Sequence, residues 1–276
     1  MEPGQGAAEL LGLWQQEHGY SPDGPFLVLS GGDNWTGPAI STWFDGQSMV
    51  EVMNAMGYHA SAVGNHEFDF GLDGLQARLG EADYPYLAAN VRSRETGTVP
   101  TGLGIQPFAI VEVAGVKIGL IGLSATYTAR VTNPDTVAGF EFIDYEQALE
   151  EVVPAVEEAG ADLIVVPAHI CLNELLPLAR QAGDLGVDLI GGGHCNELAA
   201  RQVGEVVVLA GGYHFTSYAY ATFHLDPQTR EVLSVDYAVR QNQGGQPEEA
   251  VASVVARWRD EADAELELSL IHISEP

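Results

Sequence analysis

The chain has 276 residues, 46% of them hydrophobic, and a formal net charge of −28 at neutral pH. Its apolar content is that of a folded globular protein and excludes a disordered one. The negative charge would repel phosphate backbones, so we expect no nucleic-acid polymer as a partner. A small anionic substrate would also be repelled unless the binding site held a cation.

No run of about 18 uninterrupted apolar residues is present, so we expect no membrane-spanning helix. The first residues lack the basic and then apolar regions of a signal peptide. The two cysteines, Cys171 and Cys195, are too few for a disulfide scaffold. We expect both to be small buried residues, with metal ligation as the alternative. The sequence leaves the oligomeric state and the localisation open.

Short apolar runs alternate with amphipathic helical patterns through the first two thirds of the chain. We predict buried strands at 26–30, 59–63, 86–90, 116–123, 162–168 and 187–191. We predict helices at 47–56, 72–79, 145–159 and 173–181. This alternation is typical of βαβ units and predicts an α/β fold with a mostly parallel sheet.

The pattern changes to β-hairpins after residue 203. Strands are predicted at 203–209, 218–225 and 232–239, with a turn beginning at Asp226. We expect these strands to form a second, partly antiparallel sheet packed on the first. A helical pattern follows at 247–267, but residues 268–276 do not continue it and are interpreted as a non-native tail.

Polar residues follow four of the predicted strands at the point where each strand ends. Asp33, Asn65, His169 and His194 each stand in or next to such a strand end. Each residue alone also has a structural interpretation, as part of a turn or as a satisfied polar group. Because ligands bind at the carboxyl ends of strands in open α/β sheets, we expect the four side chains to converge. Oxygen and imidazole donors together suit Mn, Fe, Zn or similar divalent ions.

These residues lie in recognisable motifs. Gly32-Asp33, the run GNHEFD at 64–69, His169 and Gly193-His194 resemble the motifs of the calcineurin-like metallophosphoesterases. The stretches SGGDNWTGP and YHASAVGNHEFDFG resemble the 5'-nucleotidase branch, which also contains enzymes acting on cyclic nucleotides and a thiosulfohydrolase. The resemblance covers about residues 6–242. It implies a four-layer α/β/β/α sandwich with mixed sheets, formed by a catalytic domain at 1–242.

The resemblance also implies two divalent metal ions. Asp33 would bridge them, and Asn65, His169 and His194 would complete the shell of the second ion. A hydroxide held by the ions would attack the phosphorus of a small phosphorylated substrate, most simply a nucleotide. The family is often periplasmic or extracellular, and residues 243–267 would link the catalytic domain to an absent C-terminal domain.

His66 and Asp69 are the catalytic residues that the resemblance implies. His66 would donate to the phosphoryl oxygens or to the leaving group. Asp69, three residues further on, would orient the imidazole and keep it protonated, which gives a general acid near neutral pH.

The chain departs from the family pattern at two places. Family members open with a strand ending in Asp-x-His, and nothing before Asp33 fits this motif, so we expect that the first strand was lost by truncation or by a misplaced start codon. The last motif is normally Gly-His-x-His, and here Asn196 stands in place of the final histidine. An amide is a weaker ligand than imidazole for the softer ions. We therefore predict one complete metal site, with Asn196 as a poor ligand of the first ion.

Two alternatives to phosphoester hydrolysis remain from the sequence. The motifs also allow a sulfur-ester hydrolase of the thiosulfohydrolase kind. The substitution at Asn196 allows a pseudo-enzyme that binds one metal ion and a phosphorylated ligand without turnover.

Overall fold

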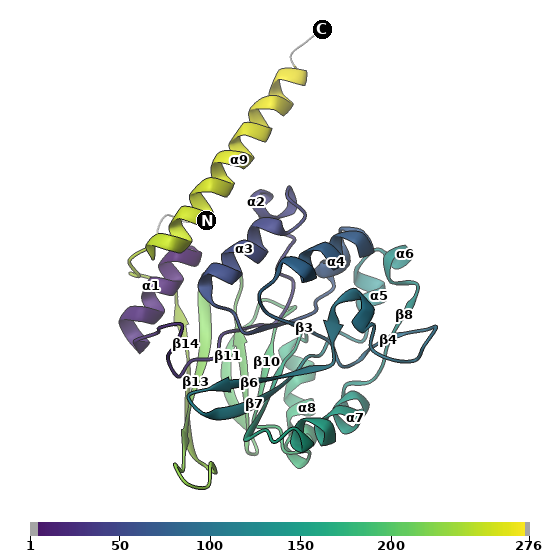
Figure 1. Ribbon diagram of the computed structural model, residues 1–276, viewed down its shortest axis with the longest axis vertical. Coiled ribbons are helices and arrows are strands. Elements are labelled where there is room, and N and C mark those ends of the chain that lie inside the picture. The colour runs from purple at the N-terminus through teal and green to yellow at the C-terminus, as the bar shows by residue number, and fades with distance from the viewer. Residues whose placement is uncertain (1–4, 274–276) are drawn as a thin grey trace.

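The structure, a computed structural model, describes residues 5–273 and has two main β-sheets with helices outside them (Figure 1). One sheet has four strands and the other has six. The apolar side chains between them come from both sheets, for example Leu87 from the first and Leu120 and Val165 from the second. This arrangement confirms the predicted four-layer α/β/β/α sandwich.

The four-stranded sheet is entirely parallel. Its strands, in spatial order, are β1 (Leu29–Ser30), β2 (Ala60–Ala62), β3 (Tyr86–Leu87) and β5 (Ile105–Gln106). Helices α3 (Gln47–Met56) and α4 (Gly71–Glu81) cover its outer face. Met53 of α3 and Leu75 of α4 pack there in one apolar cluster with Tyr86. Burial of these side chains fixes the helices against the sheet.

The six-stranded sheet is parallel in its centre and antiparallel at both edges. Its strands, in spatial order, are β11 (Leu198–Val203), β12 (Val206–Gly211), β10 (Leu189–Gly192), β9 (Leu163–Pro167), β7 (Val116–Ile121) and β6 (Phe108–Val113). Helices α7 (Tyr145–Glu158) and α8 (Leu172–Asp184) cover its outer face, where Leu149 and Leu175 are fully buried.

A separate antiparallel ribbon is formed by β13 (Ser217–Leu225) and β14 (Val232–Gln241). The predicted turn at Asp226 connects them, and its carboxylate accepts the N–H groups of Gln228 and Thr229. Helices α1 (Ala7–His18) and α9 (Glu249–Ile273) pack near this ribbon, and α9 then projects beyond the body of the molecule (Figure 1). Among the described helices, none has both the length and the apolar sequence needed to cross a bilayer.

The shorter elements lie in the connections. They are the strands β4 (Val91–Ser93) and β8 (Phe140–Phe142), the helices α2 (Ala39–Thr42), α5 (Thr128–Val131) and α6 (Pro134–Val137), and the 3₁₀ turns η1 (His66–Phe68) and η2 (Thr101–Leu103). Strands β4 and β8 pair with each other in an antiparallel arrangement.

Three predictions about the elements were wrong. We expected the strand near residue 206 to join the later hairpin, but β12 pairs with β10, with Leu189 opposite Val207, and therefore belongs to the six-stranded sheet. The earlier strands are also divided between two sheets. In addition, α9 continues to Ile273, where we expected the helix to end near residue 267. The last residues of the predicted tail, 274–276, lie outside the described part of the chain.

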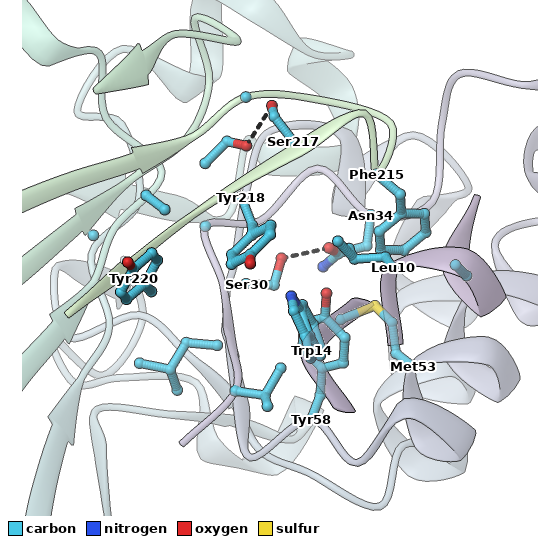
Figure 2. A pocket seen from close by; sticks show the side chains of 18 of the residues that line it. Leu10, Trp14, Ser30, Asn34, Met53, Tyr58, Phe215, Ser217, Tyr218 and Tyr220 are labelled. Atoms are coloured by element: carbon cyan, nitrogen blue, oxygen red, sulfur yellow. Dashed lines mark hydrogen bonds between the residues drawn. The ribbon is translucent and has the colours of Figure 1, made fainter. Parts of the chain in front are cut away.

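A cavity of about 1480 Å³ separates β1 from β13 (Figure 2). Strand β1 is an edge strand of its sheet, and β13 pairs only with β14 among the described strands. Both strands line the cavity, with Leu29 on one side and Ala219 on the other. Apolar residues of the six-stranded sheet, including Ile118 and Val165, line it as well. The cavity is thus an apolar space bordered by two unpaired strand edges.

Candidate metal centre

Asp33 lies at the end of β1, beyond two glycines that permit a close approach of three loops. Gly32 has a φ of 88°, and a Cβ atom there would lie 2.8 Å from the nitrogen of Gly64 and 2.9 Å from Nδ1 of His169. A side chain at this position would therefore force the loops apart. Asp33 itself has a φ of 58°, in the left-handed region that Asp tolerates better than most residues.

Glu67 holds the loop of Asp33 against the loop that follows β2. Its side chain is fully buried and accepts the N–H groups of Asp33 at 2.9 Å, Asn34 at 2.7 Å and Gly64 at 2.6 Å. Burial, together with the charge of Asp33, raises the pKa of the Glu67 carboxyl to about 7, although the backbone N–H bonds oppose this shift. The sequence identified Glu67 only as a member of the GNHEFD motif at 64–69. The structure shows that it joins the two loops.

His169 is the most firmly held residue of the group. It is fully buried, and its backbone N–H donates to the carbonyl oxygen of Leu123 at 2.7 Å. Its ring atom Nδ1 lies 2.7 Å from the carbonyl oxygen of Gly31, which can only accept. Nδ1 therefore carries the proton, and in the neutral ring Nε2 presents a lone pair.

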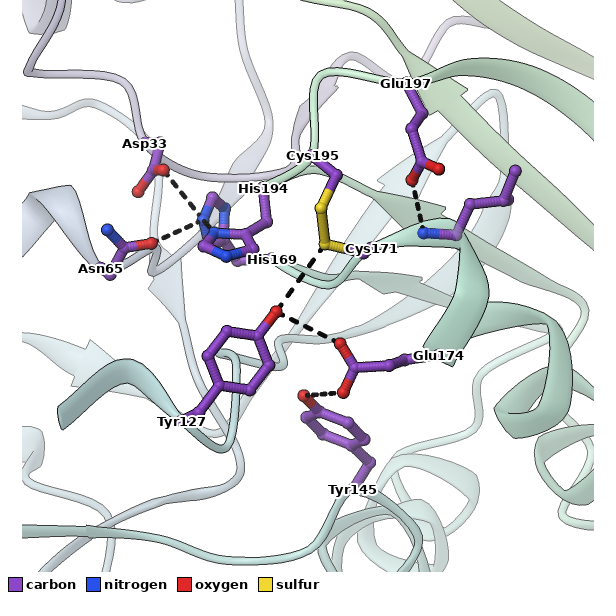
Figure 3. The surroundings of a disulfide bond; sticks show 11 residues. Asp33, Asn65, Tyr127, Tyr145, His169, Cys171, Glu174, His194, Cys195 and Glu197 are labelled. Carbon is purple, nitrogen blue, oxygen red and sulfur yellow. Dashed lines mark hydrogen bonds and ion pairs between the residues drawn. A yellow bond between two sulfur atoms is a disulfide. The ribbon is translucent and has the colours of Figure 1, made fainter. Parts of the chain in front are cut away.

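Three further polar atoms surround Nε2 of His169 (Figure 3). Oδ2 of Asp33 lies at 2.9 Å, Oδ1 of Asn65 at 3.1 Å and Nδ1 of His194 at 2.9 Å. The amide of Asn65 is oriented by Nδ2, which donates to the carbonyl oxygen of Val131 at 3.2 Å. The structure thus brings together the four residues that the sequence predicted as one group. Two come from the four-stranded sheet and two from the six-stranded sheet.

The converging atoms need a positive charge between them. A neutral His169 would direct a lone pair at the oxygen atoms of Asp33 and Asn65, which is repulsive. Without a metal ion, a proton supplies part of this positive charge. Burial opposes the charge on both partners, but their mutual hydrogen bond lowers the pKa of Asp33 and raises that of His169. Burial and the charge of His169 lower the pKa of His194, which favours its neutral, metal-binding form.

A divalent cation satisfies the same group more completely than a proton does. One ligand atom each from Asp33, His169 and His194 lies within 4.8 Å of the others, and Asn65 offers a fourth. Two oxygen and two imidazole donors suit Mn, Fe or Zn. The hydrogen bond from Nδ1 of His169 to a carbonyl is the usual support of a metal-binding histidine. The donor set therefore fits the cation that the sequence predicted.

Known proteins resemble the chain in sequence and in fold. No protein-family model matches it. The snake venom 5'-nucleotidase of Gloydius brevicauda is 34% identical over 193 residues, which is 68% of this chain and 32% of that one. The 5'-nucleotidase of Vibrio parahaemolyticus is 34% identical over 195 residues, 67% of this chain and 34% of that one. A calcineurin-like phosphoesterase from Bacillus subtilis superimposes with a TM-score of 0.81 at 21% identity, covering 94% of this chain and 90% of that one.

The chain belongs to the 5'-nucleotidase branch of the calcineurin-like phosphoesterases. The structural likeness confirms the fold, and the two sequence relatives identify the branch. The chain spans about a third of the length of these two curated relatives.

In this member of the 5'-nucleotidase branch, His66 and Asp69 lie beside the four converging residues. Nδ1 of His66 is 2.6 Å from Oδ2 of Asp69, and the backbone N–H of His66 donates to Asp33 at 2.9 Å. The hydroxyls of Thr36 and Thr132 also donate to Asp69. Partial burial lowers the pKa of His66, but the hydrogen bond to Asp69 and the nearby acidic charges outweigh it and raise the pKa. The structure thus brings His66 and Asp69 together, and their catalytic role stays a prediction.

Asn196 occupies a different position from the other expected ligands of this branch member. It lies two residues beyond His194, is exposed, and lines the large cavity together with Asp33 and His194. Its φ is 56°, in the left-handed region. Its binding of a first metal ion stays a prediction.

The prediction for the two cysteines was wrong. Cys171 is buried, but Cys195 is exposed, and the two form a disulfide. A separation of 24 residues in sequence carried no signal for this pairing. The sequence also gave no sign of Tyr127, whose ring packs edge-on against His194 with 5.4 Å between centroids (Figure 3).

Proposed function

We propose that the chain binds one divalent cation through Asp33, Asn65, His169 and His194 and hydrolyses phosphoesters of nucleotides or related phosphomonoesters. The observation that carries the proposal is the convergence of their donor atoms around Nε2 of His169. The identity of the curated relatives as 5'-nucleotidases supports the substrate class.

A bound cation would offset the charge of the phosphoryl group and make a nearby water molecule more acidic. The chain itself supplies the proton donor and the residues that hold it in place. His66, whose pKa is raised by the hydrogen bond to Asp69 and by nearby acidic charges, would donate a proton toward the phosphoryl oxygens or the leaving group. Asp69 orients the ring from one side, while Thr36 and Thr132 hold the carboxylate of Asp69 in place.

We also propose that a further strand completes the site. An extended segment placed between β1 and β13 would pair with both unpaired edges and fill the apolar cavity. The carboxyl end of such a strand, if parallel to β1, would lie beside Asp33. This position suits the Asp-x-His motif that the family resemblance places before residue 1. The two added ligands would join Asn196 around a first metal ion.

We also propose a domain organisation and a location for the protein. Residues 1–242 form the catalytic domain, and residues 243–267 link it to a C-terminal domain, since the curated relatives are about three times as long as the matched region. The Cys171–Cys195 disulfide supports a periplasmic or extracellular location, because disulfides persist in oxidising compartments.

The test is hydrolysis of p-nitrophenyl phosphate and nucleoside monophosphates with added Mn²⁺, before and after removal of metal by a chelator. We expect Mn²⁺-dependent release of phosphate that His169→Ala abolishes. The competing function, a pseudo-enzyme with one ion, is favoured by Asn196. It would be supported if Mn²⁺ binds with full stoichiometry and no substrate is hydrolysed, even when the further strand is supplied. No observation favours the sulfur-ester alternative.

A further inference from the structure

A disulfide joins the two loops that carry the histidines of the candidate metal centre (Figure 3). Cys171 stands two residues after His169 and directly before α8. Cys195 directly follows His194. The bridge therefore connects a residue two positions after His169 to the residue directly after His194.

His169 does not depend on this bridge for its position. It is fully buried, its backbone N–H is bonded to Leu123, and its ring is bonded to Gly31. These contacts come from the six-stranded sheet and from the loop after β1, and none of them involves the disulfide.

His194 is held less securely. It lies in the short loop between β10 and β11, where His194 and Asn196 both have left-handed backbone angles, with φ of 61° and 56°. Such angles are sparsely populated by residues other than glycine, so neighbouring contacts must maintain them. Two contacts join this loop to the start of α8: the disulfide, and a hydrogen bond of 2.6 Å from the N–H of Leu172 to Oε2 of Glu197.

We propose that the Cys171–Cys195 disulfide is a positioning element for His194 and that its reduction weakens metal binding. The inference rests on the proposed metal site. Without the covalent bond, the loop at 193–197 samples more conformations, and the imidazole of His194 meets the other three donors less often. His169 keeps its position, so reduction of the disulfide weakens the contribution of only one ligand, His194.

Reduction of the disulfide requires an external dithiol as the reductant. The dithiol transfers two electrons and two protons, the S–S bond breaks, two cysteine thiols form, and the dithiol becomes a disulfide. Cys195 is exposed, so a reductant can reach the bridge from that side. Metal binding would then respond to the thiol redox state of the surroundings.

The first experiment measures Mn²⁺ binding from the EPR signal of free Mn²⁺, because thiols are poor ligands for this ion. Oxidised wild type is compared with the Cys171→Ser/Cys195→Ser variant, and with wild type that has been reduced by a dithiol and desalted anaerobically. We expect the dissociation constant to rise about 10-fold or more in both, the lower end of the range for supports of metal ligands. Reoxidised wild type should bind as before. The comparison of oxidised with reduced wild type remains valid if the double variant folds poorly.

The second experiment repeats the comparison in a His194→Ala background. If the bridge acts through His194, opening it there should cause no further loss of Mn²⁺ affinity. An equal loss in both backgrounds would show general stabilisation only and would overturn the inference, as would unchanged or tighter binding after reduction. If oxidised wild type itself binds no Mn²⁺, the proposed metal site is wrong, and the inference falls with it.

Discussion

Nδ1 of His169 donates a hydrogen bond of 2.7 Å to the carbonyl oxygen of Gly31, which joins the end of one sheet to the end of the other. His169 follows β9 of the six-stranded sheet, and Gly31 follows β1 of the four-stranded sheet. This bond decides which ring nitrogen faces Asp33, and so makes Nε2 the centre of the converging donors.

The first prediction concerns the number of metal ions. The chain as it stands should bind about one Mn²⁺ or Zn²⁺ per molecule, because one donor set is complete. Elemental analysis after dialysis measures the ratio. His194→Ala should lower the affinity markedly, whereas His224→Ala, which alters an exposed ion pair with Asp236, is the matched control and should not. A ratio near two would contradict the claim that the first site is incomplete.

The second prediction separates the proton donor from the ligands. His66→Asn should leave the metal content unchanged and reduce turnover by roughly 10²–10⁴-fold, the usual scale for a general acid. Asp69→Asn should cause a smaller loss, because Asp69 acts through its hydrogen bond to the imidazole of His66. Metal analysis and phosphatase assays on the same preparations check this. A parallel loss of metal and turnover would make His66 a ligand.

The third prediction concerns Glu67. In Glu67→Gln, an amide has one acceptor oxygen for three backbone N–H groups, and its own N–H₂ meets a donor. The metal-free protein should lose about 2–4 kcal/mol of unfolding free energy, the scale for leaving buried donors unsatisfied. Urea denaturation measures this. The exposed Glu150→Gln is the control, and equal midpoints for the two variants would refute the role assigned to Glu67.

The fourth prediction is a pH dependence that involves His59. Burial lowers the pKa of His59 below its ordinary value of 6.5, and the N–H of Val28 donates to Nδ1 of the ring at 3.2 Å. The unfolded chain therefore binds the proton more readily, and this contribution to stability is present above pH 6.5 and is lost as the pH falls toward the folded pKa. Urea midpoints between pH 7.5 and 5.5 should fall more in wild type than in His59→Gln, whose amide oxygen still accepts. Parallel curves would contradict the assignment.

The fifth prediction tests the proposed further strand between β1 and β13. A chain extended by the segment encoded directly upstream of Met1 should hydrolyse p-nitrophenyl phosphate more than about ten-fold faster with Mn²⁺, because two cations activate the reaction together. It should also melt at a higher temperature, since the strand would fill the apolar cavity beside β1. An extension of equal length made of Gly and Ser is the control. Equal rates would defeat the proposal, and inactivity of both would favour the pseudo-enzyme.

The sequence predicted individual elements well where local chemistry decides them. Helix α3 has the predicted bounds: Gly46 precedes it, and Gly57 ends it with a φ of 76°, in the left-handed conformation typical of a helix C-terminus. Strand β1 ends at the predicted Ser30, directly before Gly31 and Gly32, but the strand expected at 86–90 already ends at Leu87. The rule that parallel strands present their carboxyl ends at one edge explains why Asp33 lies near Asn65 and why His169 lies near His194, and docking of the two sheets brings these pairs together.

What could not be predicted depends on contacts between distant segments. Val207 suits either sheet by composition, and only its pairing with Leu189 decides which sheet it joins. Glu67 has its role because the fold brings the N–H groups of Asp33 and Asn34 to its carboxylate. The disulfide likewise requires that α8 begin beside the loop after β10. Periodicity carries none of this information.

The division of the donors between two sheets has a consequence for the order of assembly. Asp33 and Asn65 approach His169 and His194 only after the two sheets have docked, and no short segment holds more than one of them. A metal ion therefore cannot organise this chain at an early stage, as it does in small zinc domains. We therefore expect the proposed ion to meet all four donors only after the two sheets have docked, and a bound ion would then resist separation of the sheets.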